Sequence, residues 1–136
     1  MNYGYLCNEI QHFSAMAKIT VQNTQITVLQ WAEQDYISLT DMASAKEGDS
    51  RSADIIKNWI RNRYTIEFLG TWEVIHNPNF KVVEFDHFRK SAGLPSFVLS
   101  ASEWIECTSA IGLVVKKGRY GGTYAHKDIA FEFGSA

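Results

Sequence analysis

The chain contains little cysteine and little proline, with two residues of each among its 136 residues. Cys7 and Cys107 are too few for a disulfide framework or a structural zinc site. We therefore expect free thiols in a reducing compartment, and a cytoplasmic protein. There is no proline-rich linker or internal repeat, and the length fits one domain.

The sequence also lacks an excess of positive charge and any long apolar run. Its formal net charge is −2 at pH 7, so overall charge gives no affinity for polyanions. Contacts with nucleic acid must come from local clusters, because exposed charges are screened beyond about 8 Å in physiological salt. No run approaches the roughly 18 apolar residues of a membrane span, and the N-terminus has no signal-peptide pattern. We expect no membrane partner.

What the chain does contain is enough apolar surface for a core, with 46% hydrophobic and 13% aromatic residues. Residues 1–15 have no clear period and are expected to form a poorly ordered leader before a domain at residues 16–136. From Lys18, the alternating stretches KITVQ and QITVLQ flank Asn23 and Thr24. This pattern predicts a β-hairpin.

Short strands are predicted at both ends of the domain and helices in its middle. Strands are expected at Tyr36–Leu39, Leu113–Val115 and Thr123–Ala125. Two helices are expected after capping residues, one from Thr40 to Gly48 and one from Ser52 through the apolar residues Ile55, Ile56, Trp59 and Ile60. A third is expected from Thr65 to Asn77 and a fourth over Val82–Ala92. A fifth should run from Ser100 to near Gly112, and a last helix should begin at His126. The helix from Thr65 is predicted to turn Phe68, Leu69, Trp72 and Ile75 inward. The order of elements indicates an α+β fold.

The stretch KNWIRNR is rich in cations and amides. Lys57, Arg61 and Arg63 alternate with Asn58 and Asn62, opposite the apolar stripe. Lysine and arginine neutralise phosphates, and asparagine can make a bidentate contact to an adenine edge. The pattern favours a DNA-binding face, and the alternative is a solvated helix face stabilised by acidic neighbours.

The stretch KKGRYGGTY joins the last two predicted strands. Its glycines close a hairpin easily, while Lys116, Lys117 and Arg119 have no acidic neighbour and Tyr120 can stack on a base. A phosphate-cradling loop needs a helix directly after it, and neither the Walker nor the dinucleotide glycine spacing is present. The stretch therefore favours a basic hairpin wing, with a solvated turn as the alternative.

Histidines and carboxylates give no catalytic pattern. His76, His87 and His126 could combine with Cys107 or a serine, yet no nucleophile-elbow or cysteine-protease motif accompanies them. The pairs Glu84/Asp86 and Asp128/Glu132 lack the clustering of a hydrolase site. His76 is expected at a helix C-terminus and His126 at a helix cap. We expect no enzyme activity, no metal and no cofactor.

Four stretches together resemble the KilA-N domain family of bacterial and phage proteins: YISLTDMA, IKNWIRNRYTIEFLGTWE, NPNFKVVEFDHFRKSAG and GRYGGTYAHKDIAFEF. The resemblance runs from about Lys18 to the C-terminus. It implies a compact domain related to the APSES-type DNA-binding domain, with a winged-helix-like arrangement of a helix pair and a hairpin wing. Gly118–Tyr124 resembles the family's wing pattern, and Trp59 resembles a core tryptophan. In relatives the last helix continues, so we expect it to be truncated here.

The residues and the resemblance together predict a non-catalytic DNA-binding domain of a prophage- or phage-type regulatory or antirepressor-like protein, with double-stranded DNA as its partner. The alternative is a protein–protein interaction module of the same fold without DNA binding. A protein partner or a second copy in a homo-oligomer is also considered as a partner. The predicted DNA contacts are Lys57, Asn58, Arg61, Asn62, Arg63, Lys116, Lys117, Arg119 and Tyr120.

Overall fold

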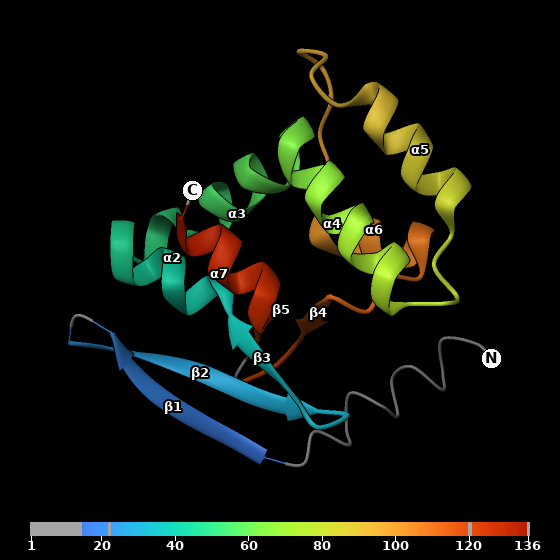
Figure 1. Cartoon of the computed structure of the whole chain (residues 1–136). Coiled ribbons are helices and arrows are strands. Elements are labelled where there is room, and N and C mark those ends of the chain that lie inside the picture. Colours follow the sequence, from blue (N-terminus) through green and yellow to red (C-terminus); the bar gives the residue numbers. More distant parts are fainter. Residues whose placement is uncertain (1–14, 22, 120, 136) are drawn as a thin grey trace.

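The computed structural model describes residues 15–135 with the exception of 22 and 120. It has an α+β fold, as predicted (Figure 1). The strands are β1 (Ala15–Val21), β2 (Thr24–Trp31), β3 (Gln34–Ser38), β4 (Leu113–Lys116) and β5 (Gly122–His126). The helices are α2 (Leu39–Glu47), α3 (Ser52–Ile60), α4 (Arg63–His76), α5 (Val82–Ser91), α6 (Ala101–Thr108) and α7 (Lys127–Ser135), with a 3₁₀ turn at Asp49–Arg51.

All strand pairs in the five-stranded sheet are antiparallel, and their order is β1-β2-β3-β5-β4. The predicted N-terminal hairpin is confirmed, with β1 and β2 paired from Val21 opposite Thr24 onward. The strand β1 already includes Ala15, one residue before the predicted domain start, and residues 1–14 lie outside the described part. The predicted C-terminal hairpin is also confirmed, and β5 pairs with β3. The two ends of the chain thus build one sheet.

The helices gather on one side of the sheet, as Figure 1 shows. Neighbouring residues of a strand point to opposite faces, so β3, β4 and β5 each contribute to two clusters. The main core joins the helices to the sheet, and its fully buried members include Leu39, Ile60, Ile66, Leu69, Trp104, Leu113 and Ile129. A smaller cluster contains Leu29, Tyr36, Val114 and Tyr124. Burial on this scale is the main source of the fold's stability.

Three predicted helix starts were wrong by one or two residues. Ser38, rather than Thr40, caps α2, because its Oγ accepts the N–H of Asp41 at 3.0 Å. Ser52 is the first residue of α3 rather than its cap, and α4 begins at Arg63 instead of Thr65. Each region offers more than one capping residue within four positions, so propensity alone does not choose among them.

Two further details of the helical middle differ from the prediction. Ile75 is 70% exposed, and the buried position beside Trp72 belongs to Glu73. The helix α6 ends at Thr108, where Ser109 takes the left-handed conformation with φ 59°, several residues before Gly112. The Ser100 cap of α6 and the Gly48 end of α2 are confirmed.

Candidate nucleic-acid interface

The basic stretch KNWIRNR forms a helix–turn–helix junction rather than one helix. Arg61 caps the end of α3, Asn62 caps the start of α4, and Arg63 is the first residue of α4. This corrects the prediction that all the residues share one helix face. The structure nevertheless brings them together, and all of them are exposed: Lys57, Asn58, Arg61, Asn62 and Arg63.

The exposed side of α3 carries charges of both signs. Lys57 and Arg61 lie one turn apart on this side, and Asp54 shares it. On the opposite side, Trp59 is 9% exposed and packs edge-on against Phe133, with ring centroids 4.9 Å apart. The predicted core role of Trp59 fits this position, and the cations point away from it.

Two residues of the junction already have partners in the structure. The Asn62 Oδ1 accepts the N–H of Tyr64 at 2.9 Å, so a base contact would compete with its role as a cap. The Arg63 Nε donates to the Glu67 Oε2 at 3.2 Å. Both side chains of this ion pair are about half exposed, and such pairs contribute roughly 0–1 kcal/mol. Arg63 can therefore leave Glu67 for a phosphate at little cost.

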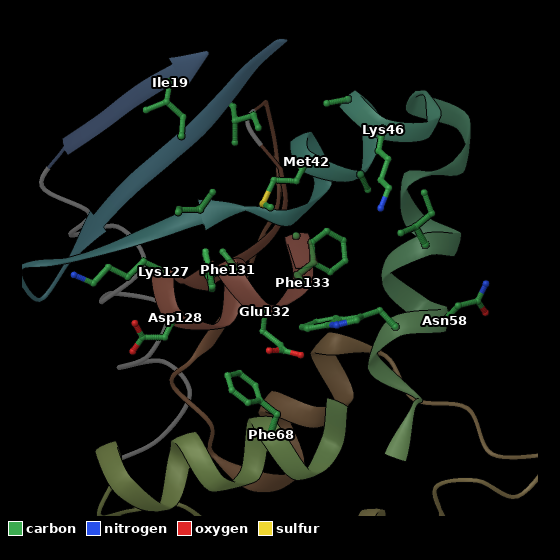
Figure 2. A pocket seen from close by; sticks show the side chains of 18 of the residues that line it. Ile19, Met42, Lys46, Asn58, Phe68, Lys127, Asp128, Phe131, Glu132 and Phe133 are labelled. Carbon is green, nitrogen blue, oxygen red and sulfur yellow. The ribbon is translucent and has the colours of Figure 1, made fainter. Parts of the chain in front are cut away.

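Asn58 and Asn62 also line a hollow of about 1170 Å³ whose other walls are mainly apolar. Figure 2 shows Asn58 on one side, with Met42, Phe131 and Ile19 contributed by other elements. Phe131 is 79% exposed. Sequence reasoning missed this apolar surface, because it forms only when α7, α3 and the β1–β2 hairpin come together.

The predicted C-terminal hairpin is formed by β4 and β5. Lys116 lies opposite Gly122 at the end of the ladder, and the N–H of Gly121 donates to the Gly118 carbonyl at 2.9 Å to close the turn. Gly118 has φ 98°, a conformation that glycine adopts without strain. Lys117 and Arg119 are exposed, Lys116 is half-buried, and Tyr120 lies outside the described residues. A strand follows the glycines, as the hairpin prediction requires.

The base of this hairpin is attached to the start of α2. The Thr40 Oγ1 accepts the N–H of Thr123 at 3.0 Å. A Cβ on Gly122 would lie 2.7 Å from the same oxygen, so only glycine permits this approach. The helix α2 packs against both β5 and α3. Thr40, which the sequence suggested only as a cap, therefore helps to join the hairpin to the helical part of the candidate interface.

A family model for the KilA-N domain matches residues 19–136. The chain belongs to the KilA-N domain family. This confirms the predicted resemblance, and KilA-N domains are in general DNA-binding domains and not typically catalytic. No curated protein and no solved structure matches the chain.

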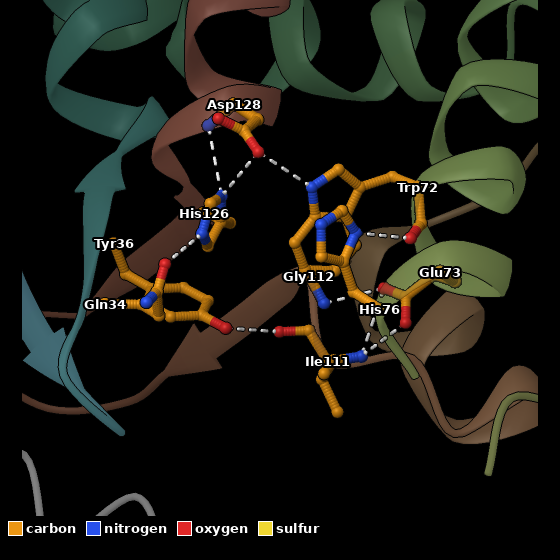
Figure 3. A network of polar contacts seen from close by, with 9 residues as sticks. All are labelled: Gln34, Tyr36, Trp72, Glu73, His76, Ile111, Gly112, His126 and Asp128. Carbon is orange, nitrogen blue, oxygen red and sulfur yellow. Dashed lines mark hydrogen bonds and ion pairs between the residues drawn. The ribbon is translucent and has the colours of Figure 1, made fainter. Parts of the chain in front are cut away.

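In this KilA-N domain a buried carboxylate fixes the entry to the hairpin (Figure 3). Glu73 is 1% exposed. It accepts the N–H of Gly112 at 2.6 Å, the N–H of Ile111 at 3.0 Å and a side-chain N–H of Asn77 at 2.9 Å. Burial raises the pKa of the Glu73 carboxyl above its usual value, while these hydrogen bonds oppose the rise. Glu73 thus connects the end of α4 to the segment that leads into β4.

His126 has a structural role at the start of α7. Its Nδ1 accepts the N–H of Asp128 at 3.1 Å, so its Nε2 carries the hydrogen and donates to the Gln34 Oε1 at 2.8 Å. Burial lowers the pKa of His126, which favours the neutral ring. The Asp128 carboxylate accepts the indole N–H of Trp72 at 3.1 Å. Both ring nitrogens are occupied, and the predicted cap is confirmed (Figure 3).

The described part of this KilA-N domain contains neither a metal-binding cluster nor a candidate membrane span. Within residues 15–135, apart from 22 and 120, no three histidine, cysteine or acidic side chains lie close enough to hold a metal ion. Over the same residues, no helix combines the length and the apolar character needed to cross a membrane.

Proposed function

We propose that this KilA-N domain binds double-stranded DNA through the α3–α4 junction and the β4–β5 hairpin, used as a winged helix. The observation that carries the proposal is that α2 packs against both elements, while their cations Lys57, Arg61, Lys117 and Arg119 are exposed. The domain is non-catalytic in this proposal, and belongs to a regulatory or antirepressor-like cytoplasmic protein of prophage or phage type.

The proposed contacts differ in what they contribute. Lys57, Arg61, Lys116 and Lys117 contact phosphates, which supplies affinity without sequence information. Asn58, exposed near the end of α3, reads a base edge in this proposal. Arg63 supports phosphate binding after leaving Glu67, and Asn62 acts chiefly as the cap that shapes the turn.

The remaining predicted contacts lie at the tip of the hairpin. Arg119 reaches a base edge or a phosphate in this proposal, and Tyr120 stacks on a sugar or base. Gly118, with φ 98°, lets the chain turn tightly beside Arg119.

Binding to duplex DNA across a range of salt concentrations tests the proposal. If about five phosphates are neutralised, the logarithm of affinity falls against the logarithm of salt concentration with a slope of about −4 to −5. Fluorescence anisotropy of a labelled random duplex measures this slope. Binding that does not depend on salt, or that is undetectable in dilute buffer, would overturn the proposal.

Single substitutions then test the wing. Lys116→Ala and Lys117→Ala should each weaken binding to all duplexes alike and reduce the slope by about one. Lys90→Ala is the matched control, because it removes the same charge from α5, where Lys90 pairs with Asp86 at 3.0 Å. If Lys90→Ala weakens binding as much as the wing variants, the wing is not the contact surface.

The apolar hollow favours a second candidate function. Phe131 is largely exposed beside it, and Asp54 lowers the positive charge of the α3 face. These features suit a protein-interaction module of the same fold that does not bind DNA. Loss of a protein partner on Phe131→Ser, together with undetectable DNA binding, would favour this function over the first.

A further inference from the structure

The two edges of the sheet differ in how they are protected. The edge strand β4 has four residues, its Leu113 and Val114 are buried, and α6 packs against it. The other edge strand, β1, has seven residues and pairs only with β2 among the described residues. The side chains described for β1 are all exposed: Ala17, Lys18, Ile19 and Thr20.

The hydrogen bond of Thr27 shows which backbone groups of β1 face outward. The N–H of Thr27 donates to the Asp41 Oδ2 at 2.8 Å and therefore points away from β1. Opposite residues in an antiparallel pair either exchange both hydrogen bonds or exchange none. Lys18 lies opposite Thr27, so the N–H and C=O of Lys18 point away from β2. By the two-residue period, those of Thr20 do so as well.

Natural proteins protect such an edge with charges, proline, a bulge or a covering element. In β1 the only charged residue is Lys18, there is no proline, and all seven residues pair with β2 in continuous register. Ile19, next to the central residue Lys18, is 43% exposed and borders two hollows. A long, regular edge with an exposed apolar residue favours pairing with another strand.

We propose that β1 pairs in antiparallel fashion with β1 of a second copy of this chain, about a two-fold axis at Ile19. In this register Lys18 lies opposite Thr20 of the partner subunit, and both residues have the outward backbone groups that hydrogen bonding requires. Ile19 then lies opposite the partner's Ile19 in a non-hydrogen-bonded pair, the type in which side chains approach most closely.

The sequence of β1 suits this self-pairing. A two-fold axis at Lys18 would place two lysines opposite each other, and like charges in that position are destabilising. The axis at Ile19 avoids this repulsion and removes the exposed isoleucine from water. A pair of short strands buries less than the roughly 1,200 Å² of a standard interface, so the dimer is weak and depends on concentration. The strand carries none of the proposed DNA contacts, so the pairing does not require DNA.

Sedimentation equilibrium on the full chain, up to submillimolar concentration, tests the dimer. The wild type and Ile19→Val should show a reversible monomer–dimer equilibrium, whereas Ile19→Lys should remain monomeric because two lysines would oppose each other. Circular dichroism shows whether each variant retains the wild-type fold. A wild type that is monomeric at every concentration would overturn the proposal, as would a folded Ile19→Lys that dimerises like Ile19→Val.

Disulfide trapping tests the register. In a background with Cys7→Ser and Cys107→Ser, Ile19→Cys should form a disulfide-linked dimer on mild oxidation, because a non-hydrogen-bonded pair brings the two Cα atoms to about 4.5 Å. Thr20→Cys is the control, since its two copies are offset by two residues and exceed the roughly 7 Å limit for a disulfide. Equal trapping of both variants would exclude this register, and trapping of neither would exclude the pairing.

Discussion

Replacing Glu73 by glutamine should destabilise the domain although the two side chains have nearly the same shape. Both carboxylate oxygens of Glu73 accept hydrogen bonds, one from Asn77 and Ile111 and the other from Gly112 and Ile111. Glutamine has only one oxygen, and its NH₂ group must face an N–H donor on one side. The substitution therefore leaves a buried donor without an acceptor.

The size of the effect follows from two opposing terms. A hydrogen bond to a charged group contributes about 1.5–3 kcal/mol, and an unsatisfied buried donor costs about 1–3 kcal/mol. The variant also removes the cost of burying a charge, which offsets part of the loss. We expect Glu73→Gln to lower the free energy of unfolding by about 2–3 kcal/mol. At roughly 3 °C per kcal/mol for a chain of this length, Tm falls by about 6–9 °C.

Urea denaturation followed by tryptophan fluorescence measures this difference, and Glu67→Gln on the same helix is the matched control. Glu67 is half exposed in a surface ion pair with Arg63, so its replacement should cost less than about 1 kcal/mol. Equal stability of Glu73→Gln and the wild type would refute the argument that the buried carboxylate holds α4 to the hairpin.

The pH dependence gives an independent check. The pKa of Glu73 is raised in the folded state, so the folded state binds a proton more readily than the unfolded state. The contribution of this proton binding to the free energy of unfolding is fully present below the ordinary glutamate pKa of about 4.3. It is lost as pH rises through the raised pKa of Glu73 in the folded state. The difference in unfolding free energy between the wild type and Glu73→Gln should therefore decrease as pH rises through that window. A difference that grows with pH would contradict the raised pKa.

Two further substitutions test the core and the hairpin base. Trp59→Ala should cost about 3–5 kcal/mol in urea denaturation, because it empties the space beside Phe133, and a variant of unchanged stability would show that Trp59 is not a core residue. Gly122→Ala should lower the free energy of unfolding by about 1–3 kcal/mol, because the φ of Gly122 is 147° and the new Cβ would meet Thr40. Gly118→Ala should cost less, because a Cβ at Gly118 would lie in open space. The reverse order of the two variants in thermal denaturation would contradict the contact between Gly122 and Thr40.

Local chemistry explains why much of the fold could be predicted from the sequence. The alternation around Asn23 predicted the first hairpin, and the Ser100 capping spacing predicted the start of α6. Each of these signals lies within a few residues of the element that it determines. The exposed basic residues of the candidate site were found for the same reason, since the stripe of Trp59 and Ile60 defines which side of α3 is buried.

Contacts between distant parts of the chain could not be predicted in this way. Nothing in the sequence indicated that Glu73 is buried, and Ile75 was predicted to be buried although it is exposed. Their positions depend on the backbone of residues 111 and 112, which reaches α4 only after the fold has formed. The role of Thr40 similarly requires β5 to lie beside β3, a pairing that joins segments far apart in the sequence.

These two long-range contacts hold both strands of the hairpin. Glu73 fixes the approach to β4 at Gly112, and Thr40 fixes the start of β5 at Thr123. The described tip residues Lys117, Gly118 and Arg119 lie between these two anchors. Precise placement of a binding element requires support of this kind from outside the contact surface. At a temperature where Glu73→Gln remains folded, we therefore expect weaker DNA binding with an unchanged salt slope, because the phosphate contacts persist but the hairpin that carries them is held less firmly.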